Sequence, residues 1–168
     1  MKNMNIYLIR HAESVYNAKK ILQGRQDCEL SSRGLKDTVR RSLSFPNDFD
    51  IIFCSPLKRT RQTAKILLPN SEIIYDERIM ERGFGNWENM PITDEKQFLL
   101  NNQVIPPNGE TLEELDSRIS EFIAMLKKDY KNKRVLVITH AGIIYTLYRI
   151  LNIPKKIVDN LEIVEIVI

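Results

Sequence analysis

Short apolar runs separated by stretches of helical length constrain the fold of this chain more than any other feature. Each run has the length and character of a buried strand. Strands that alternate with helices form layered α/β domains with a mainly parallel sheet. The predicted strands are residues 4–9, 50–54, 72–75, 134–139 and 161–168. With the last of them at an edge, the pattern predicts a three-layer α/β/α sandwich whose mainly parallel central sheet carries an antiparallel edge strand.

Signals for the starts of helices stand between the predicted strands. Ser31 suits the N-cap of one helix, and Ser55 followed by Pro56 suits the start of the next. Thr111 and Glu114 form a capping-box pattern before a long amphipathic stretch. Helices are therefore predicted over residues 31–43, 55–68, 93–100, 111–126 and 141–151.

Composition argues against several classes of function. The 25 Lys and Arg residues exceed the 22 Asp and Glu residues by only three, and their scatter does not favour a nucleic-acid surface. No run reaches the ~18 apolar residues of a membrane span, and no signal peptide is visible. Cys28 and Cys54 are too widely spaced for a zinc motif, so we expect reduced thiols in a cytoplasmic protein. A length of 168 residues predicts one domain, residues 1–168.

The two histidines of the chain both follow predicted strands. His11 ends the run that begins at Ile6, and His140 ends the run that begins at Val135. Ligands of parallel α/β sheets bind at the carboxyl ends of the strands, so we expect both imidazoles in one crevice. A single histidine is more often structural, but the shared setting, with Arg10 beside His11, favours a joint site.

These side chains suit a phosphoryl group. Arg10 and Arg59 carry planar cations that match phosphate oxygens, and Arg59 lies in the first turns of a predicted helix. Imidazole can act as a nucleophile, an acid, a base or a metal ligand. Two histidines without a nearby carboxylate pattern do not favour a metal site. Fixed cations would stabilise the charge that spreads over a phosphoryl group during its transfer.

A leaving group also needs a proton donor. Glu81 stands in a glycine-flanked loop next to the third predicted strand and is the best placed carboxylate. Glu77 and Glu88 lie near it in sequence, and Glu13 lies near His11. Spacing alone does not separate Glu81 from these three.

Five sequence elements resemble those of the histidine phosphatase superfamily, also called the phosphoglycerate-mutase-like proteins. They occur in the family's order and extend over nearly the whole chain. They are residues 8–14, similar to the Arg-His-Gly-Glu signature; 55–64, similar to Ser-x-x-x-Arg-x-x-x-Thr-Ala; 81–88, similar to Glu-x-x-Phe-Gly-x-Trp-Glu; 107–110, similar to the Gly-Glu before the long helix; and 139–142, similar to the second-histidine motif.

The resemblance implies a role for each candidate side chain. His11 would be the nucleophile that forms a phosphohistidine. Arg10, Arg59 and His140 would hold and neutralise the phosphoryl group. Glu81 would protonate the leaving oxygen and then accept a proton from the attacking water. The family needs no metal and no cofactor.

The resemblance also implies a phosphate pocket lined by Asn17, Gln23 and the backbone of Gly24. Asn17 equally suits the cap of a turn, and Gln23 with Gly24 suits an ordinary loop. Three positions depart from the family's glycines, namely Ala12, Asn89 and Ala141. A methyl group at Ala12 would be strained if that position needed a positive φ.

Three functions remain compatible with the sequence. The length and the acidic loop resemble those of small phosphatases such as the α-ribazole phosphatases, which implies a small phosphorylated metabolite as the substrate. A cofactor-dependent phosphoglycerate mutase is the alternative, but the roughly thirty residues between Glu81 and Thr111 leave little room for the long insertion of mutases. The third is a module that binds a phosphorylated ligand without catalysis, which the presence of all five proposed catalytic groups disfavours.

Overall fold

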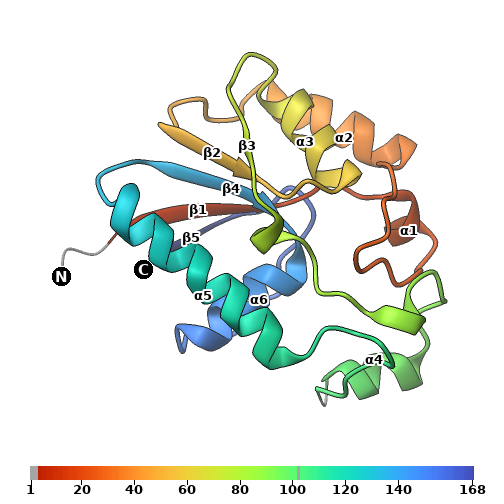
Figure 1. The fold of residues 1–168 in the computed structure, drawn as a ribbon. Helices are drawn as coiled ribbons and strands as arrows, with labels where there is room; N and C mark the ends of the chain where they lie inside the picture. The colour runs from red at the N-terminus through yellow and green to blue at the C-terminus, as the bar shows by residue number, and fades with distance from the viewer. Residues whose placement is uncertain (1–3, 102) are drawn as a thin grey trace.

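The computed structural model describes residues 4–101 and 103–168, and a sheet lies at its centre (Figure 1). The strand order in this sheet is β3-β2-β4-β1-β5. The strands are β1 (Asn5–Arg10), β2 (Ile51–Cys54), β3 (Ile74–Tyr75), β4 (Val135–Thr139) and β5 (Ile163–Val167). All neighbours pair in parallel except β5, which runs antiparallel to β1 at the edge. The predicted sheet type and its antiparallel edge strand are confirmed.

Helices cover both faces of the sheet and complete the three predicted layers. The covering helices are α2 (Ser32–Ser42), α3 (Lys58–Leu67), α5 (Leu112–Asp129) and α6 (Ala141–Ile150). α2 and α3 lie over one face, and α5 and α6 lie over the other (Figure 1). The three-layer α/β/α architecture is therefore confirmed.

Each face of the sheet packs its own apolar core. Under α5 and α6, the ring of Phe53 meets the ring of Phe122 edge to face, with the centroids 5.3 Å apart. Under α3, Ile9 and Ile138 pack with Ala64. Every residue of β4 is buried because this strand is central and covered on both faces. Burial of a large apolar side chain contributes about 1.5–3 kcal/mol, so the end of β4 is a firm base for the residues that follow it.

Two of the three predicted helix N-caps are confirmed. The Ser31 hydroxyl accepts the N–H of Gly34 at 2.9 Å. Thr111 and Glu114 form the reciprocal capping box at the start of α5. The predicted cap at Ser55 is wrong, because α3 begins only at Lys58.

The start of α3 is capped from a distant loop instead. The carboxylate of Asp27 accepts the backbone N–H of Lys58, which is one of the donors that a helix start leaves unpaired. Ser55 is thereby released from capping, and its hydroxyl lies against His140.

Two stretches lie outside the layers. Residues 10–30, whose sequence predicts irregular backbone, contain the short helix α1 (Val15–Ala18). Between β3 and α5 the chain forms the turns η1 (Glu77–Ile79) and η2 (Gly85–Trp87) and the helix α4 (Asp94–Asn101), none of whose described residues is buried. In residues 4–101 and 103–168, no helix has the length and apolar character needed to cross a membrane.

Candidate active site

The two histidines meet because their strands are neighbours. Arg10, the last residue of β1, pairs with Thr139, the last residue of β4. His11 and His140 therefore leave the sheet side by side, with their ring centroids 5.2 Å apart and an angle of 61° between the ring planes. Both are buried, with 3% and 0% of their surface exposed. The structure thus brings both imidazoles into one site at the carboxyl end of the sheet.

Hydrogen bonding fixes the ring of His11 with one nitrogen free. The carbonyl oxygen of Ala12 lies 2.7 Å from Nδ1 and can only accept, so Nδ1 donates and carries the proton. Nε2 therefore keeps its lone pair. Burial lowers the pKa of His11 well below its ordinary value of 6.5, and the charges of Arg59 and Arg10 lower it further. A neutral imidazole with a free nitrogen is the form that can attack phosphorus.

The loop before β5 holds the backbone of this nucleophile candidate. The side-chain amide of Asn160 donates to the carbonyl of His11 at 2.7 Å. The guanidinium of Arg10 donates through Nη1 to the carbonyl of Val158 at 2.8 Å, and the N–H of Leu161 donates to the carbonyl of Arg10 at 3.0 Å. The sequence carries no local signal for these contacts, which join residues about 150 positions apart.

His140 is oriented by the buried hydroxyl of Ser55. Its Nε2 lies 2.8 Å from the Ser55 oxygen, which also accepts the N–H of Leu57 at 3.5 Å. The hydroxyl can donate to Nε2 or accept from it, depending on the tautomer of the ring. Nδ1 is buried and has no partner among the described residues. Burial lowers the pKa of His140, with further contributions from Arg59 and His11.

The two predicted arginines flank the histidines and keep unused donors. Arg59 is 1% exposed and donates to the carbonyls of Gln26 and Gly24 at 2.9 and 2.8 Å. Burial lowers the pKa of Arg59, and the charge of Glu81 opposes that shift. The Nε atoms of Arg10 and Arg59 are buried and find no acceptor in the described part of the chain. A buried donor without an acceptor costs about 1–3 kcal/mol, which an oxyanion bound here would relieve.

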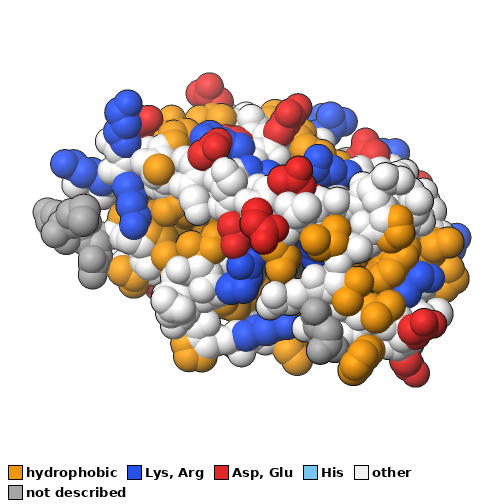
Figure 2. All heavy atoms as spheres, turned by 60° about the horizontal axis from the view of Figure 1, so that its bottom comes forward, with side chains coloured by type: hydrophobic (Ala, Val, Ile, Leu, Met, Phe, Trp, Pro, Cys, Tyr) orange, Lys and Arg blue, Asp and Glu red, His pale blue; other side chains and the backbone are white. Residues whose placement is uncertain are grey.

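A cavity of about 710 Å³ opens beside His11. Of the predicted site residues, those that contribute to its lining are Arg10, His11, Asn17, Gln23, Gly24, Arg59 and Glu81. His140 lies next to His11 but is not part of the lining. The outer wall includes Phe84, Ile92 and Leu100 from the segment around α4. Figure 2 shows hydrophobic side chains gathered on the side of the molecule that carries α4, at the right of the view.

Glu81 is held by backbone donors at the edge of this cavity. One carboxylate oxygen accepts the N–H of Arg82 at 2.9 Å, and the other accepts the N–H of Gly142 at 3.3 Å. A Cβ atom at Gly142 would lie 2.2 Å from the Glu81 carboxylate, so glycine makes room for the acid at the start of α6.

The three competing carboxylates are placed elsewhere. Glu13 accepts the hydroxyl of Ser31 at 2.6 Å, and Glu88 accepts the backbone N–H groups of Arg25 and Phe84. Glu77 lies in η1. Among the described residues that line the cavity beside His11, Glu81 is the single acidic side chain. In lining this cavity, Glu81 differs from the three alternatives that spacing leaves open.

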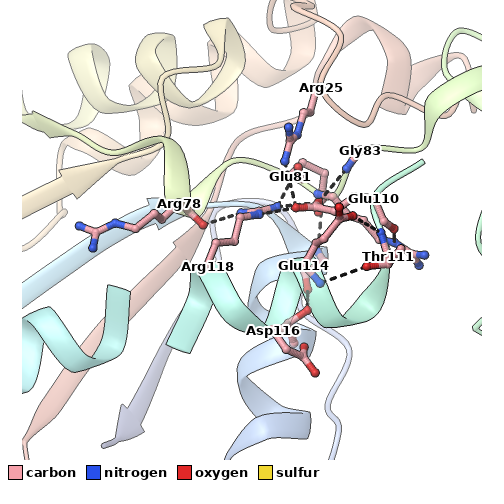
Figure 3. Close-up of polar contacts among 12 residues, drawn as sticks. Arg25, Arg78, Glu81, Gly83, Glu110, Thr111, Glu114, Asp116 and Arg118 are labelled. Atoms are coloured by element: carbon pink, nitrogen blue, oxygen red, sulfur yellow. Dashed lines mark hydrogen bonds and ion pairs between the residues drawn. The ribbon is translucent and has the colours of Figure 1, made fainter. Parts of the chain in front are cut away.

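A partly buried ion pair supports the loop that carries Glu81 (Figure 3). Arg118 of α5 donates to the Glu110 carboxylate at 2.6 and 2.9 Å and to the carbonyl of Glu81 at 3.3 Å. Arg25 and the N–H of Gly83 donate to the same carboxylate at 3.0 and 3.1 Å. Burial alone would raise the pKa of Glu110, but the hydrogen bond and charge of Arg118 outweigh it and hold the pKa below its ordinary value of 4.5.

The residues of the predicted phosphate pocket line the cavity and also make local backbone contacts. Asn17 completes a capping box with Ser14 at the start of α1, and it also lines the cavity. Ser14 donates to the side-chain oxygen of Gln23 at 2.7 Å. Gly24 has a φ of +53°, and its carbonyl accepts from Arg59. A Cβ there would lie 2.1 Å from the Glu88 carboxylate, so this turn needs glycine.

The departures from the family's glycines cause no strain at the nucleophile. Ala12 is not among the described residues with a positive φ, and its N–H donates to the Thr63 hydroxyl at 3.1 Å. Asn89 does have a left-handed φ of +66°, which asparagine tolerates better than most residues. The alanine at position 12 therefore fits its backbone.

Comparison with known proteins decides the family. The model of the histidine phosphatase superfamily (branch 1) matches residues 6–166. The chain belongs to the histidine phosphatase superfamily. A superfamily relative from Bacillus subtilis, described as uncharacterized phosphatase PhoE, is 36% identical over 149 residues, which is 84% of this chain and 74% of that protein. The adenosylcobalamin/alpha-ribazole phosphatase of Escherichia coli is 28% identical and covers 91% of this chain and 82% of its own length.

A solved structure leads to the same superfamily. The crystal structure of phosphoserine phosphatase from Entamoeba histolytica, in complex with 3-phosphoglyceric acid, superposes with a TM-score of 0.81 at 25% identity. The match covers 96% of this chain and 89% of that chain. The predicted family is confirmed, and its relatives support the assignment of this chain as a phosphatase.

Proposed function

We propose that the chain, acting as one domain, hydrolyses small phosphomonoesters through a phosphohistidine on His11. The observation that carries the proposal is the state of the His11 ring. Its Nδ1 proton is committed to the Ala12 carbonyl, which leaves Nε2 as a free nucleophile in a buried site. The cations of Arg10 and Arg59 and the carboxylate of Glu81 line the same cavity.

The first step transfers the phosphoryl group to the enzyme. His11 Nε2 forms a bond to phosphorus while the ester P–O bond breaks, and protonated Glu81 gives its proton to the leaving oxygen. Arg10 and Arg59 donate to the phosphoryl oxygens, and His140, beside His11, helps to hold and neutralise the group. Arg59 and His140 are buried and Arg10 is partly buried, so their charges and dipoles act on the transition state with reduced screening by water.

The second step releases phosphate. Glu81, now a carboxylate, takes a proton from a water molecule whose oxygen bonds to phosphorus. The P–N bond breaks, and its electron pair returns to His11 Nε2. The balance is one ester and one water consumed for one alcohol and one phosphate, with no metal ion and no cofactor in the scheme.

The substrate is proposed to be a small phosphorylated metabolite, since the cavity holds about 710 Å³ and small-molecule sites fall in this range. We also propose a cytoplasmic location. Cys28 and Cys54 are free thiols, and reducing compartments keep cysteines in this state.

Phosphate release from a panel of phosphomonoesters in the presence of EDTA tests the proposal. The panel includes 4-nitrophenyl phosphate, α-ribazole phosphate, sugar phosphates and phosphoglycerates. We expect release by the wild type that EDTA does not reduce and that His11→Asn abolishes. Lys156→Gln is the control, because Lys156 pairs with Glu162 and does not line the cavity.

Three results would overturn the proposal. Hydrolysis that persists in His11→Asn would exclude this nucleophile. Phosphate binding without release from any ester would indicate a binding module, and isomerisation of 3-phosphoglycerate primed by 2,3-bisphosphoglycerate would indicate a mutase.

A further inference from the structure

The cavity carries more positive charge than one phosphoryl group requires. Besides Arg10 and Arg59, its lining includes Arg82, Arg149 and Lys155. Within the described residues, the lining therefore holds five cationic side chains against the single carboxylate of Glu81. The three additional cations lie on elements that do not carry the phosphoryl arginines.

Arg149 is neutralised within the protein. It donates to both oxygens of Asp116 at 2.6 and 2.5 Å, as a bidentate pair between α6 and α5. This bidentate pair uses two of the five N–H donors and balances the charge of Arg149 within the protein.

Arg82 is buried without a carboxylate bound to it. It is 7% exposed, and its Nε donates to the backbone carbonyl of Glu110 at 3.1 Å. The carboxylate of Glu110 is occupied by Arg118 and Arg25. In the described chain, Nη2 of Arg82 is buried with no hydrogen-bond partner. A buried cation in this condition is costly unless an anion completes its contacts.

Lys155 is the second cation without an acidic partner. Its Nζ lies 4.7 Å from the centroid of the Tyr145 ring, and the described residues provide no ion pair for it. The adjacent Lys156 differs, because it contacts the Glu162 carboxylate at 2.8 Å. The segment after α6 thus directs one lysine to the cavity and the other to a surface ion pair.

Arg82 and Lys155 line the same cavity, and apolar and aromatic side chains line it with them. Tyr145, Tyr148 and Ile153 line the cavity together with Arg82 and Lys155. We propose that the substrate's leaving group carries a second anionic group, a carboxylate or a further phosphate, which Arg82 and Lys155 bind. This inference rests on the proposed phosphatase function and narrows its substrate class.

Two pairs of esters that differ by one negative charge test the inference. They are 3-phosphoglycerate against glycerol 3-phosphate, and 4-carboxyphenyl phosphate against 4-carbamoylphenyl phosphate. Because hydrogen bonds to charged groups are strong, we expect kcat/KM to favour the charged member of at least one pair by about tenfold or more. The preference should fall as ionic strength rises.

Matched variants assign the preference to its residues. Lys155→Gln and Arg82→Gln should each reduce the charge preference several-fold. Lys155→Gln should do so with the smaller change in kcat/KM for the uncharged member, because Lys155 does not contact Glu81. Lys156→Gln should keep the wild-type preference. Arg82 lies next to Glu81, so Arg82→Gln could lose all turnover. In that case the charge preference of Lys155→Gln decides the test.

The outcomes separate the inference from the function on which it rests. No turnover of any ester would overturn the phosphatase function. Turnover with equal kcat/KM for both members of both pairs, or a preference that both variants retain, would overturn the second-anion site alone.

Discussion

The strand ends and the segment between β3 and α5 supply different halves of the proposed chemistry, and they are held in different ways. His11 and His140 follow adjacent central strands, so the backbone ladder sets their separation. Glu81 lies outside the sheet on a loop that side-chain contacts from Glu110 and Arg118 support. The comparison shows that the proposed nucleophile is placed by the sheet. The proposed acid is placed by backbone donors on a loop that an ion-pair network supports.

Removal of the acid should have the largest effect that distinguishes the two regions. Glu81→Gln is expected to lower kcat for alkyl phosphates by about 10²–10⁴-fold, because the leaving oxygen loses its proton donor. Esters with acidic leaving groups should lose less in the first step. Steady-state kinetics across leaving groups measure this, with Glu77→Gln as the matched control. Equal losses in the two variants would contradict the choice of Glu81.

Disruption of the loop's ion pair should affect both stability and the acid. Glu110→Gln removes the negative charge that faces Arg118, and we expect the free energy of unfolding to fall by about 2 kcal/mol. Urea denaturation measures this change. Asp116→Asn is the comparison, because its pair with Arg149 is about one-third exposed and should contribute no more than about 1 kcal/mol. A smaller loss in Glu110→Gln than in Asp116→Asn would contradict the support assigned to this pair.

The strand-end histidines should make stability depend on pH. The pKa values of His11 and His140 are lowered in the folded protein, mainly by burial, so below pH 6.5 the unfolded chain binds protons that the folded chain does not. Folding stability is therefore complete above pH 6.5 and falls as the pH decreases. Each histidine contributes a slope of up to about 1.4 kcal/mol per pH unit. Urea denaturation between pH 7 and pH 5 should show a shallower decrease in His11→Asn, and an unchanged slope would refute the burial argument.

The smallest expected effect concerns the orientation of His140. Ser55→Ala removes the hydroxyl 2.8 Å from Nε2, and we expect kcat to fall by about tenfold with little change in KM. The pH dependence of kcat should also shift, which a purely structural role would not cause. Ser42→Ala, on the surface of α2, serves as the control. A change in KM alone would argue that Ser55 acts on binding instead.

The sequence predicts the parts of this molecule that depend on local pattern. Apolar runs locate the strands, and residues that follow adjacent parallel strands must meet, which is why the sequence alone pairs His11 with His140. The caps at Ser31 and Thr111 are also local, since each acts on backbone within three residues.

The parts that the sequence does not predict depend on contacts between distant segments. Ser55 looks like a helix cap, but Asp27 caps α3 from another loop and Ser55 contacts His140 instead. Asn160 reaches His11 across 149 positions. Glu81 is separated from Glu77 and Glu88 only by the cavity, which forms when the loop packs against α6.

The measurement that tests the central claim most directly is rapid-quench trapping of the phosphoenzyme. Glu81→Gln with 4-nitrophenyl phosphate suits the test, because the leaving group needs no proton while the hydrolysis step loses its base. The account predicts a burst of one nitrophenolate per enzyme molecule and a base-stable, acid-labile phosphate on His11, located by peptide mass spectrometry. Turnover without a burst, or phosphate on any other residue, would contradict it.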